Sequence, residues 1–324
     1  MTHELVRDVF VAHLDNPFLS TLSDAVVLPE LTAGCRPALT TDAFVVDPAV
    51  FPGGDVGYLS VCGTINDLAV AGAKPLYLTW ALILEEGADG ELLEVCAKGA
   101  SRAAEEAGVL IVAGDTKVVP HGRGDKIYIT TAGLGEIPME RHVGDDRIAV
   151  GDAILVTGSI GEHGATIMAC RHHLSGDNLK SDCAPLNHLL ESLFRAELEI
   201  HSMHDPTRGG ILTTCHEVAG RTGLRISLEE ELIPVRPEVQ AVCELLGLDP
   251  LSVPCEGRAL IWCPAEQADP ILNLLRQHPL GEGAVRIGMM APLDPGKAPV
   301  ILTNAYGADR PLDLLAGSDL PRIC

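Results

Sequence analysis

Apolar runs of strand length and helical patterns alternate along the whole of this sequence. Runs typical of β-strands occur at residues 38–46, 109–113, 127–133, 153–158, 224–228, 258–263 and 285–290. Helical spacing of apolar residues occurs between them, at 57–72, 90–107, 161–174, 184–198, 209–222, 237–246 and 265–278. The helix over 90–107 has the clearest ends, since Asp89 is a suitable N-cap and Gly108 a suitable C-cap. This mixture predicts an α/β (α+β) fold.

The length of the chain indicates more than one domain. Its 324 residues are 47% hydrophobic, which is enough for a sizeable core. The charged stretch 141–151 ends in the turn-forming pair Gly151-Asp152, just before a new apolar strand, so we place a domain boundary there. Near the end of the sequence, Gly317 and Pro321 prevent continuous regular structure. The predicted parts are a domain over 1–148, a domain over 149–312 and a mobile tail over 313–324.

The charge of the chain excludes several classes of partner. It has 23 basic and 45 acidic residues, a net charge of −22, with no basic tail or stripe. Such a field repels phosphate backbones and anionic lipids, so we expect no binding to nucleic acid or to membrane surfaces. We see no leader and no apolar run of membrane-spanning length, and therefore expect a soluble, cytoplasmic protein. The ten cysteines lack a CxxC pair and regular spacing, which argues against a zinc module or a disulfide framework.

Four aspartates occupy positions where burial of an unpaired carboxylate would cost free energy or where ligand-binding groups commonly lie. Asp42 lies within an apolar strand, and Asp67 interrupts the apolar series of a helix. Asp115 follows a buried strand, and Asp205 begins a loop that leads into a helix. Each one alone is equally well explained as a turn or cap residue. Together they favour a site for Mg²⁺, which needs carboxylate oxygens and binds nucleotide phosphates at the same time.

Two loops add groups that suit a phosphate. The first, Gly-Asp-Thr-Lys at 114–117, supplies the hydroxyl of Thr116 and the ammonium of Lys117. The second, Asp-Pro-Thr-Arg-Gly-Gly at 205–210, supplies the guanidinium of Arg208 and backbone N–H groups from Gly209 at a helix start, although a plain helix-initiating turn has the same sequence. Neither loop has the spacing of a Walker or a Rossmann motif, so both of those classes are disfavoured.

The last residue of the chain, Cys324, is a second candidate for chemistry. A terminal thiol is an incidental frayed end in most proteins. Beside a nucleotide site it favours a different interpretation, a swinging arm that carries a covalently attached group. The histidines have no partner at ligand spacing, which argues against metal ligation by them.

These segments together resemble the HypE family of [NiFe]-hydrogenase maturation proteins. The resemblance runs from about residue 38 to the end, and its most specific element is the terminal Pro-Arg-Ile-Cys. The segments that carry it are Thr41-Asp42, Phe51-Pro-Gly-Gly, Cys62-Gly-Thr-Ile-Asn-Asp67, Ile83-Leu-Glu-Glu-Gly, Gly114-Asp-Thr-Lys-Val-Val, Gly161-Glu-His-Gly-Ala-Thr, Asp205-Pro-Thr-Arg-Gly-Gly and Pro321-Arg-Ile-Cys324. The resemblance implies the two-domain fold of the aminoimidazole ribonucleotide synthetase and selenophosphate synthetase superfamily, with a flexible C-terminal tail.

The resemblance also implies an activity. It is the ATP-dependent dehydration of an S-carbamoyl group on Cys324 to a thiocyanate, which becomes a cyanide ligand of the hydrogenase iron. Because an amide oxygen leaves poorly, ATP converts it to a phosphate before it departs. Asp42, Asp67, Asp115 and Asp205 would hold Mg²⁺ and ATP.

By the same resemblance, Glu256 is the base that removes protons from the carbamoyl nitrogen, and Lys117 orients the carbamoyl oxygen or transfers the phosphoryl group. The implied partners are a second copy of the chain, the HypF carbamoyltransferase and a HypC-HypD complex. The first domain would dimerise through its sheet, and the second would cover the ATP cleft. One segment departs from the family: no glycine-rich His-Gly-Ser-Gly-Gly stretch precedes Asp42, so we expect weaker independent ATP binding by the chain as given.

Two alternatives stay open at this point. An ATP-dependent enzyme of the same superfamily that acts on a free small molecule would not need the tail. A non-catalytic metal or assembly scaffold would need clustered Cys or His ligands, which the sequence lacks.

Overall fold

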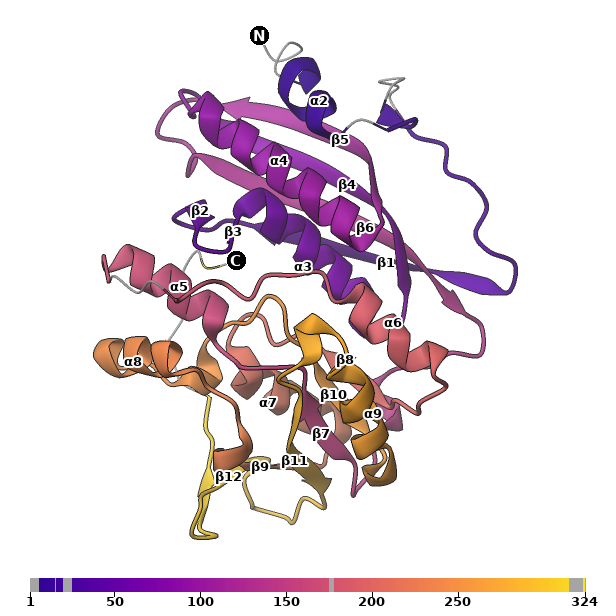
Figure 1. Cartoon of the computed structure of the whole chain (residues 1–324), viewed down its shortest axis with the longest axis vertical. Helices are drawn as coiled ribbons and strands as arrows, with labels where there is room; N and C mark the ends of the chain where they lie inside the picture. The colour runs from indigo at the N-terminus through magenta and orange to yellow at the C-terminus, as the bar shows by residue number, and fades with distance from the viewer. Residues whose placement is uncertain (1–5, 15, 20–24, 175–177, 315–322, 324) are drawn as a thin grey trace.

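The chain folds around two β-sheets, each covered by helices (Figure 1). The computed structural model describes residues 6–14, 16–19, 25–174, 178–314 and 323. Residues before 139 form a four-stranded sheet, and residues from 153 to 311 form a seven-stranded one. The predicted mixture of helices and strands is confirmed.

The four-stranded sheet has the strand order β1-β6-β4-β5. β1 and β4 pair antiparallel with β6, and β4 pairs parallel with β5. Its strands are β1 (Cys35–Phe44), β4 (Lys74–Glu85), β5 (Leu110–Val119) and β6 (Ile127–Pro138). A short hairpin of β2 (Val50–Phe51) and β3 (Gly54–Asp55) precedes the first long helix.

Two long helices, α3 (Val56–Val70) and α4 (Gly90–Ala107), lie over one face of this sheet (Figure 1). Every residue of α3 except Asp67 is buried, which is why this helix has no clear polar face in the sequence. The two helices approach closely at Gly57, where an added Cβ would lie 1.9 Å from the Cys96 carbonyl oxygen. α4 has the predicted ends, with the Asp89 side chain capping its N-terminus and Gly108 in the left-handed conformation after it.

The seven-stranded sheet has the order β13-β12-β9-β11-β7-β10-β8 and is antiparallel except for the β9–β12 pair. Its strands are β7 (Ala153–Val156), β8 (Ser202–His204), β9 (Arg225–Glu229), β10 (Leu260–Cys263), β11 (Val285–Ala291), β12 (Val300–Thr303) and β13 (Asp309–Pro311). The other α-helices are α2 (Ala12–Leu14), α5 (Glu162–Arg171), α6 (Asn187–Arg195), α7 (Gly210–Thr222), α8 (Pro237–Leu246) and α9 (Ala268–Leu275).

Both faces of the second sheet are covered. One core cluster joins α7 to the side chains Ile154 and Val156 of β7, and another joins α6 and α9 to Ala153 and Leu155 of the same strand. A strand buried on both faces has a continuous apolar sequence, as the sequence of β7 does. α6 also packs against α3, so it connects the two halves of the molecule (Figure 1).

The structure corrects several predicted elements. β4, β8 and β12 were not expected, because an apolar segment as long as β4 does not by itself distinguish a strand from a buried helix and the other two strands are very short. The helix expected over 184–198 begins only at Asn187, after Pro185. The helix expected over 265–278 consists of a 3₁₀ turn, Ala265–Gln267, followed by α9.

The predicted tail is described at Asp313, Leu314 and Ile323, and the rest of it lies outside the described residues. Within the described part of the chain, no helix has the length and apolar character needed to cross a membrane.

Candidate active site

Asp42, Asp67, Asp205 and Glu256 form one group, which we call the acidic cluster, between the two sheets. Asp42 is on the helix-covered face of β1, and Asp67 is on α3. Asp205 follows the end of β8 and Glu256 precedes β10, and these two strands pair antiparallel, so the two residues lie at the same edge of the second sheet. The structure therefore joins residues from four separate segments of the sequence.

The cluster holds more negative charge than its neighbours neutralise. Thr40 donates a hydrogen bond of 2.8 Å to Asp67, and Asp42 accepts one of 2.7 Å from the backbone N–H of Ala43. Burial, together with the charge of Asp67, raises the pKa of Asp42 to about 6 and that of Asp205 to about 7. Burial also raises the pKa of Asp67. A site with this electrostatic balance favours a bound cation.

Glu256 is the most strongly perturbed member of the acidic cluster. Its side chain is 2% exposed, and Oε1 has no hydrogen-bond partner in the structure. Burial raises its pKa well above the usual range, and the charges of Asp205, Asp182, Asp42 and Asp67 raise it further. A buried carboxyl group with an unused oxygen is placed to exchange a proton with a ligand.

The backbone around Glu256 is held from both halves of the molecule. The Asp182 carboxylate accepts hydrogen bonds from the N–H groups of Glu256 and Gly257, at 3.3 and 3.1 Å. From α3, the Asn66 amide donates to the carbonyl oxygens of Glu256 and Ala184, at 3.3 and 3.1 Å. The catalytic candidate is thus positioned by side chains that the sequence analysis did not single out.

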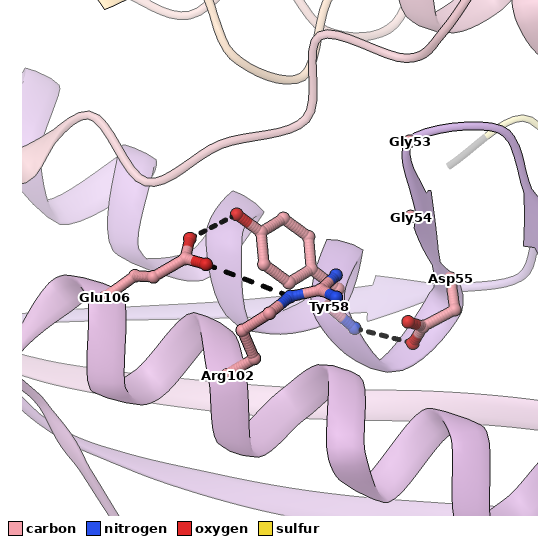
Figure 2. A pocket seen from close by; sticks show the side chains of 6 residues that line it. All are labelled: Gly53, Gly54, Asp55, Tyr58, Arg102 and Glu106. Atoms are coloured by element: carbon pink, nitrogen blue, oxygen red, sulfur yellow. Dashed lines mark hydrogen bonds and ion pairs between the residues drawn. The ribbon is translucent and has the colours of Figure 1, made fainter.

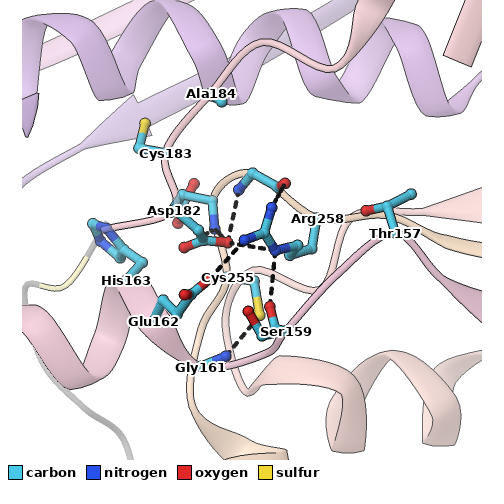
Figure 3. Close-up of polar contacts among 12 residues, drawn as sticks. Thr157, Ser159, Gly161, Glu162, His163, Asp182, Cys183, Ala184, Cys255 and Arg258 are labelled. Carbon is cyan, nitrogen blue, oxygen red and sulfur yellow. Dashed lines mark hydrogen bonds and ion pairs between the residues drawn. The ribbon is translucent and has the colours of Figure 1, made fainter. Parts of the chain in front are cut away.

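A second polar network supports Asp182 (Figure 3). The Arg258 guanidinium lies 3.9 Å from Asp182 and 2.6 Å from Glu162, and it donates to the Ser159 carbonyl oxygen. Arg236 forms a second ion pair with Glu162, at 3.1 Å. These carboxylates are paired, in contrast to those of the acidic cluster, so they have a structural role in holding the Glu256 loop.

Arg208 and Gly209 stand at the start of α7, as predicted. Arg208 is exposed, and its positive charge acts on Asp42. Gly209 has a φ of +78°, and an added Cβ would lie 2.0 Å from the Thr213 hydroxyl, so only glycine fits there. The Arg208 guanidinium and the N-terminus of the 13-residue helix α7 therefore lie next to the acidic cluster. Both suit an anion, such as a phosphate, that binds together with a metal ion.

The structure does not bring Asp115 and Lys117 to this cluster within one chain. In the first sheet Asp42 of β1 is paired with Thr131 of β6, Thr131 with Trp80 of β4, and Trp80 with Gly114 of β5, so these four residues lie on one face. Because neighbouring strand residues point to opposite faces, Asp115 and Lys117 lie on the face opposite Asp42, and both are exposed. Thr116 lies on the same face as Asp42, two strands beyond β6.

The acidic cluster fits Mg²⁺ only together with a ligand that brings oxygen atoms. Within the described ranges, no three His, Cys, Asp or Glu side chains converge closely enough to hold a metal ion by themselves. Mg²⁺ commonly uses one or two protein carboxylates and completes its shell with phosphate oxygens and water. The unneutralised carboxylates are donors of this kind, so the residues fit a magnesium nucleotide better than a metal ion alone.

A separate polar pocket of about 570 Å³ lies beside the β2–β3 hairpin (Figure 2). Tyr58 donates a hydrogen bond to Glu106 at 2.5 Å, and the Arg102 guanidinium lies 4.4 Å above the Tyr58 ring. Asp55 caps α3 through the N–H of Tyr58. The pocket is lined by Gly53, Gly54, Asp55, Tyr58, Arg102 and Glu106. Its two carboxylates share one guanidinium, that of Arg102, so the pocket has a partly compensated charge and no unpaired cation to bind a phosphate.

Cys324 lies outside the described residues, but its neighbour Ile323 is described. Ile323 is 2% exposed and belongs to the core cluster that contains Cys62, Ile167 and Cys183. Its carbonyl oxygen lies 2.7 Å from Nε2 of His163 on α5.

Comparison with known proteins agrees with this architecture. Residues 22–137 match the family described as AIR synthase related protein, N-terminal domain, and residues 149–295 match the corresponding C-terminal domain. A crystal structure of hydrogenase maturation protein HypE in complex with ATP is 45% identical, with a TM-score of 0.94 over 99% of this chain and 96% of that one. The HypE–HypF complex structure matches with 40% identity and a TM-score of 0.82, over 96% of this chain and 99% of that one.

Curated relatives agree with the solved structures. Carbamoyl dehydratase HypE of Cupriavidus necator is 45% identical over 99% of this chain and 91% of its own length, and that of Escherichia coli is 43% identical over 99% and 95%. The fold and the two domain matches define an AIR synthase-related enzyme of two α/β domains. Within that class, the chain belongs to the HypE carbamoyl dehydratase family of hydrogenase maturation proteins. The resemblance inferred from the motifs is therefore confirmed.

Sequence reasoning missed the residues that position the site. Glu162 and His163 lie in a motif that carried the resemblance. The sequence did not indicate their partners, Arg258 and Ile323, because these lie far along the chain. Asp182 and Asn66 act through backbone groups more than 70 residues away. The one available signal was the cost of burying such polar side chains unpaired.

Proposed function

We propose that this chain dehydrates an S-carbamoyl group on its own Cys324 to a thiocyanate, with consumption of ATP, and so supplies the cyanide ligand of the hydrogenase iron. The observation that carries the proposal is Glu256, a buried carboxyl group with an unused oxygen inside an unneutralised acidic cluster. Curated relatives of this chain are named carbamoyl dehydratase HypE, and a similar protein, hydrogenase maturation protein HypE, was solved in complex with ATP.

The site residues have two roles, binding of the magnesium nucleotide and proton transfer. Asp42, Asp67 and Asp205 hold Mg²⁺ and, with Arg208 and Gly209, the ATP phosphates. Magnesium neutralises charge that develops on the transferred phosphoryl group. The raised pKa values of Asp42 and Asp205 support this assignment, because a cation supplies the positive charge that these side chains lack.

The chemistry at the tail proceeds through the carbamoyl oxygen. This oxygen attacks the γ-phosphorus of ATP and ADP leaves; the C–O bond then breaks, phosphate departs and the C≡N bond forms. Two protons leave the nitrogen in the course of the reaction. Glu256 accepts a proton from the nitrogen, and its raised pKa makes the ionised carboxylate a stronger base than an exposed glutamate.

Lys117, Asp115 and Thr116 enter the proposal through a second copy of the chain. Leu39 and Ile83 are 76% and 40% exposed on the face of the first sheet that the helices leave open. A second copy packed on this face covers both apolar side chains and encloses Asp115 and Lys117. We propose a homodimer of this kind, in which Lys117 orients the carbamoyl oxygen or transfers the phosphoryl group. A monomer in sedimentation at micromolar concentration would contradict it.

A solved structure of a relative supports one of the remaining partners, HypF, and the family resemblance implies the other, a HypC-HypD complex. A HypE–HypF complex has been solved, and we propose that HypF delivers the carbamoyl group to this chain and that a HypC-HypD complex receives the cyanide. We further propose that the chain consists of a domain over 1–148, a domain over 149–312 and a mobile tail over 313–324.

The direct experiment follows the mass of the intact chain. After incubation with HypF, carbamoyl donor and Mg·ATP, we expect a gain of one carbamoyl group followed by the loss of one water. The Cys324→Ser chain is expected to show neither change. Removal of Ile323-Cys324 without loss of product formation from a free small molecule would instead favour the alternative superfamily activity.

A further inference from the structure

We infer that His163 is the docking residue of the C-terminal tail and positions the terminal cysteine by holding the carbonyl oxygen of Ile323. This inference goes beyond the proposed function by naming what holds the tail, and its catalytic consequence rests on that function.

The tail contact is a specific one. His163 is completely buried at the start of α5, and Nε2 lies 2.7 Å from the Ile323 carbonyl oxygen. The Ile323 side chain is itself buried in the core cluster. Among the described residues of the tail, Ile323 is thus held both by a polar contact of its backbone and by the packing of its side chain in the core cluster.

The hydrogen-bond chain around His163 defines the tautomer of its ring. A carbonyl oxygen only accepts, so Nε2 must carry the proton that is donated to Ile323. Nδ1 lies 2.8 Å from the Ser181 hydroxyl, which therefore donates to it, and the same hydroxyl oxygen accepts the Cys183 N–H at 3.1 Å. Burial lowers the pKa of His163 to about 4, so the ring is neutral at physiological pH, as this tautomer requires.

Both halves of the molecule contribute to the docking site. Phe51 of the β2–β3 hairpin contacts the His163 ring edge-on, with centroids 5.3 Å apart. The Ser181 backbone N–H donates to the Pro52 carbonyl oxygen at 2.9 Å. The hairpin therefore fixes both His163 and its partner Ser181.

The docking site and the Glu256 loop share one segment of the chain. Ser181 contacts His163, and the next residue, Asp182, holds the backbone N–H groups of Glu256 and Gly257. Ile323 directly precedes Cys324, and one residue spans only about 3.8 Å between Cα atoms. Holding Ile323 at this segment therefore limits the positions from which the terminal sulfur reaches Glu256.

The test measures how often Ile323 leaves its site. Carboxypeptidase removes Ile323 only while the tail is undocked, so the rate of its loss, followed by intact mass, reports the undocked fraction. For His163→Phe, which keeps an aromatic ring but no donor, we expect Ile323 to be lost about five times faster, the effect of one hydrogen bond. His163→Gln keeps a donor and is expected to restore most of the protection.

A matched control is available in the same chain. His216 makes the same kind of contact, from Nε2 to the Leu312 carbonyl oxygen at 2.8 Å, away from Ile323. His216→Phe is expected to leave the loss of Ile323 unchanged. Ser181→Ala, a smaller change than His163→Phe, is expected to increase it about twofold to threefold by freeing the ring tautomer.

The functional arm uses carbamoylated protein in a single turnover. His163→Phe is expected to slow the loss of water about fivefold while the ATP concentration for half-maximal rate stays the same. Equal loss of Ile323 from wild type, His163→Phe and Ser181→Ala would overturn the inference. If Ile323 is lost faster as expected but wild type never loses water, the docking site stands and the proposed function fails.

Discussion

Two sets of acidic side chains in this molecule have opposite electrostatic surroundings. The acidic cluster (Asp42, Asp67, Asp205 and Glu256) has raised pKa values and few partners. Asp145 and Asp152, which we call the linker pair, lie where the chain passes from the first sheet to the second. In the linker pair every carboxylate has a partner.

Asp145 shows what full pairing does. It accepts hydrogen bonds from Ser202 and His204 at 2.7 and 2.8 Å, and the Arg221 guanidinium lies 2.7 Å away. Burial alone would raise its pKa, but these contacts outweigh it and lower the pKa to about 2. Asp152 is held in the same manner, by His201 at 2.7 Å and by the N–H of Ala149 at 2.9 Å.

The contrast separates carboxylates that stabilise the fold from carboxylates that await a ligand. Asp145 stabilises the folded state, because its ionised form has more favourable contacts there than in water. The acidic cluster destabilises the folded state whenever its members are ionised without a cation. This cost is typical of a functional site.

The largest expected effect follows from removing the base. Glu256→Gln should slow the loss of water from carbamoylated protein by about 10² to 10⁴, the usual contribution of a general base. ATP binding should stay, since the change removes one proton acceptor and keeps the shape of the side chain. The comparison variant is Glu199→Gln, an exposed glutamate beside the linker pair. Wild-type turnover by Glu256→Gln would remove this residue from the mechanism.

The next effect concerns the support of the Glu256 loop. Asp182→Asn replaces a fully buried carboxylate that faces Arg258 and two backbone N–H groups. We expect a loss of about 2 kcal/mol in the free energy of unfolding, because the amide nitrogen of asparagine leaves a buried backbone N–H group without its acceptor, whereas Arg258 keeps its closer partner Glu162. Urea unfolding measures it. A loss below about 0.5 kcal/mol, the level of an ordinary surface change, would show that the loop does not depend on Asp182.

Within the linker pair, Asp145 predicts a pH-dependent effect of about 2 kcal/mol. A lowered folded-state pKa stabilises the protein above the unfolded value of 3.8, and this stabilisation is lost as the pH falls toward 2. Asp145→Asn should therefore lower the free energy of unfolding by about 2 kcal/mol at pH 7 and by progressively less below pH 4. Urea titrations at several pH values test this. A difference that is independent of pH would mean that the Asp145 charge is not the cause.

The acidic cluster predicts a change of the opposite sign. Because the folded-state pKa of Asp205 is raised to about 7, its contribution to stability is present below pH 3.8 and lost as the pH rises through 7. In the presence of a chelator, Asp205→Asn should raise the stability at pH 8 by at least about 1 kcal/mol, and by less at pH 6. The same variant should lose activity. A variant less stable than wild type at pH 8 would contradict the contrast.

The sequence predicted this site only in part, for reasons that the contrast explains. Asp42 and Asp67 were visible because a carboxylate within an apolar strand or helix is anomalous, and Glu256 was assigned only through the family resemblance. The partners of buried groups were not visible, since Asp182 and Asn66 reach the Glu256 loop across long stretches of chain. Asp115 was grouped with the other aspartates from its place after a strand, whereas strand register puts it on the opposite face. In the fold, β7 was predictable because its continuous apolar run has the length of a strand, whereas the 12-residue apolar segment of β4 is long enough to be a buried helix as well.

The most direct test of the central claim is the effect of Mg·ATP on the thermal unfolding of wild type, Asp67→Asn, Asp205→Asn and Asp145→Asn. At a hundredfold excess over its Kd, Mg·ATP should stabilise wild type and Asp145→Asn by about 2.7 kcal/mol, and it should raise Tm by several degrees. Asp67→Asn and Asp205→Asn should show little or no rise at the same concentration. An equal rise in all four proteins would contradict the claim that the unpaired carboxylates bind the magnesium nucleotide.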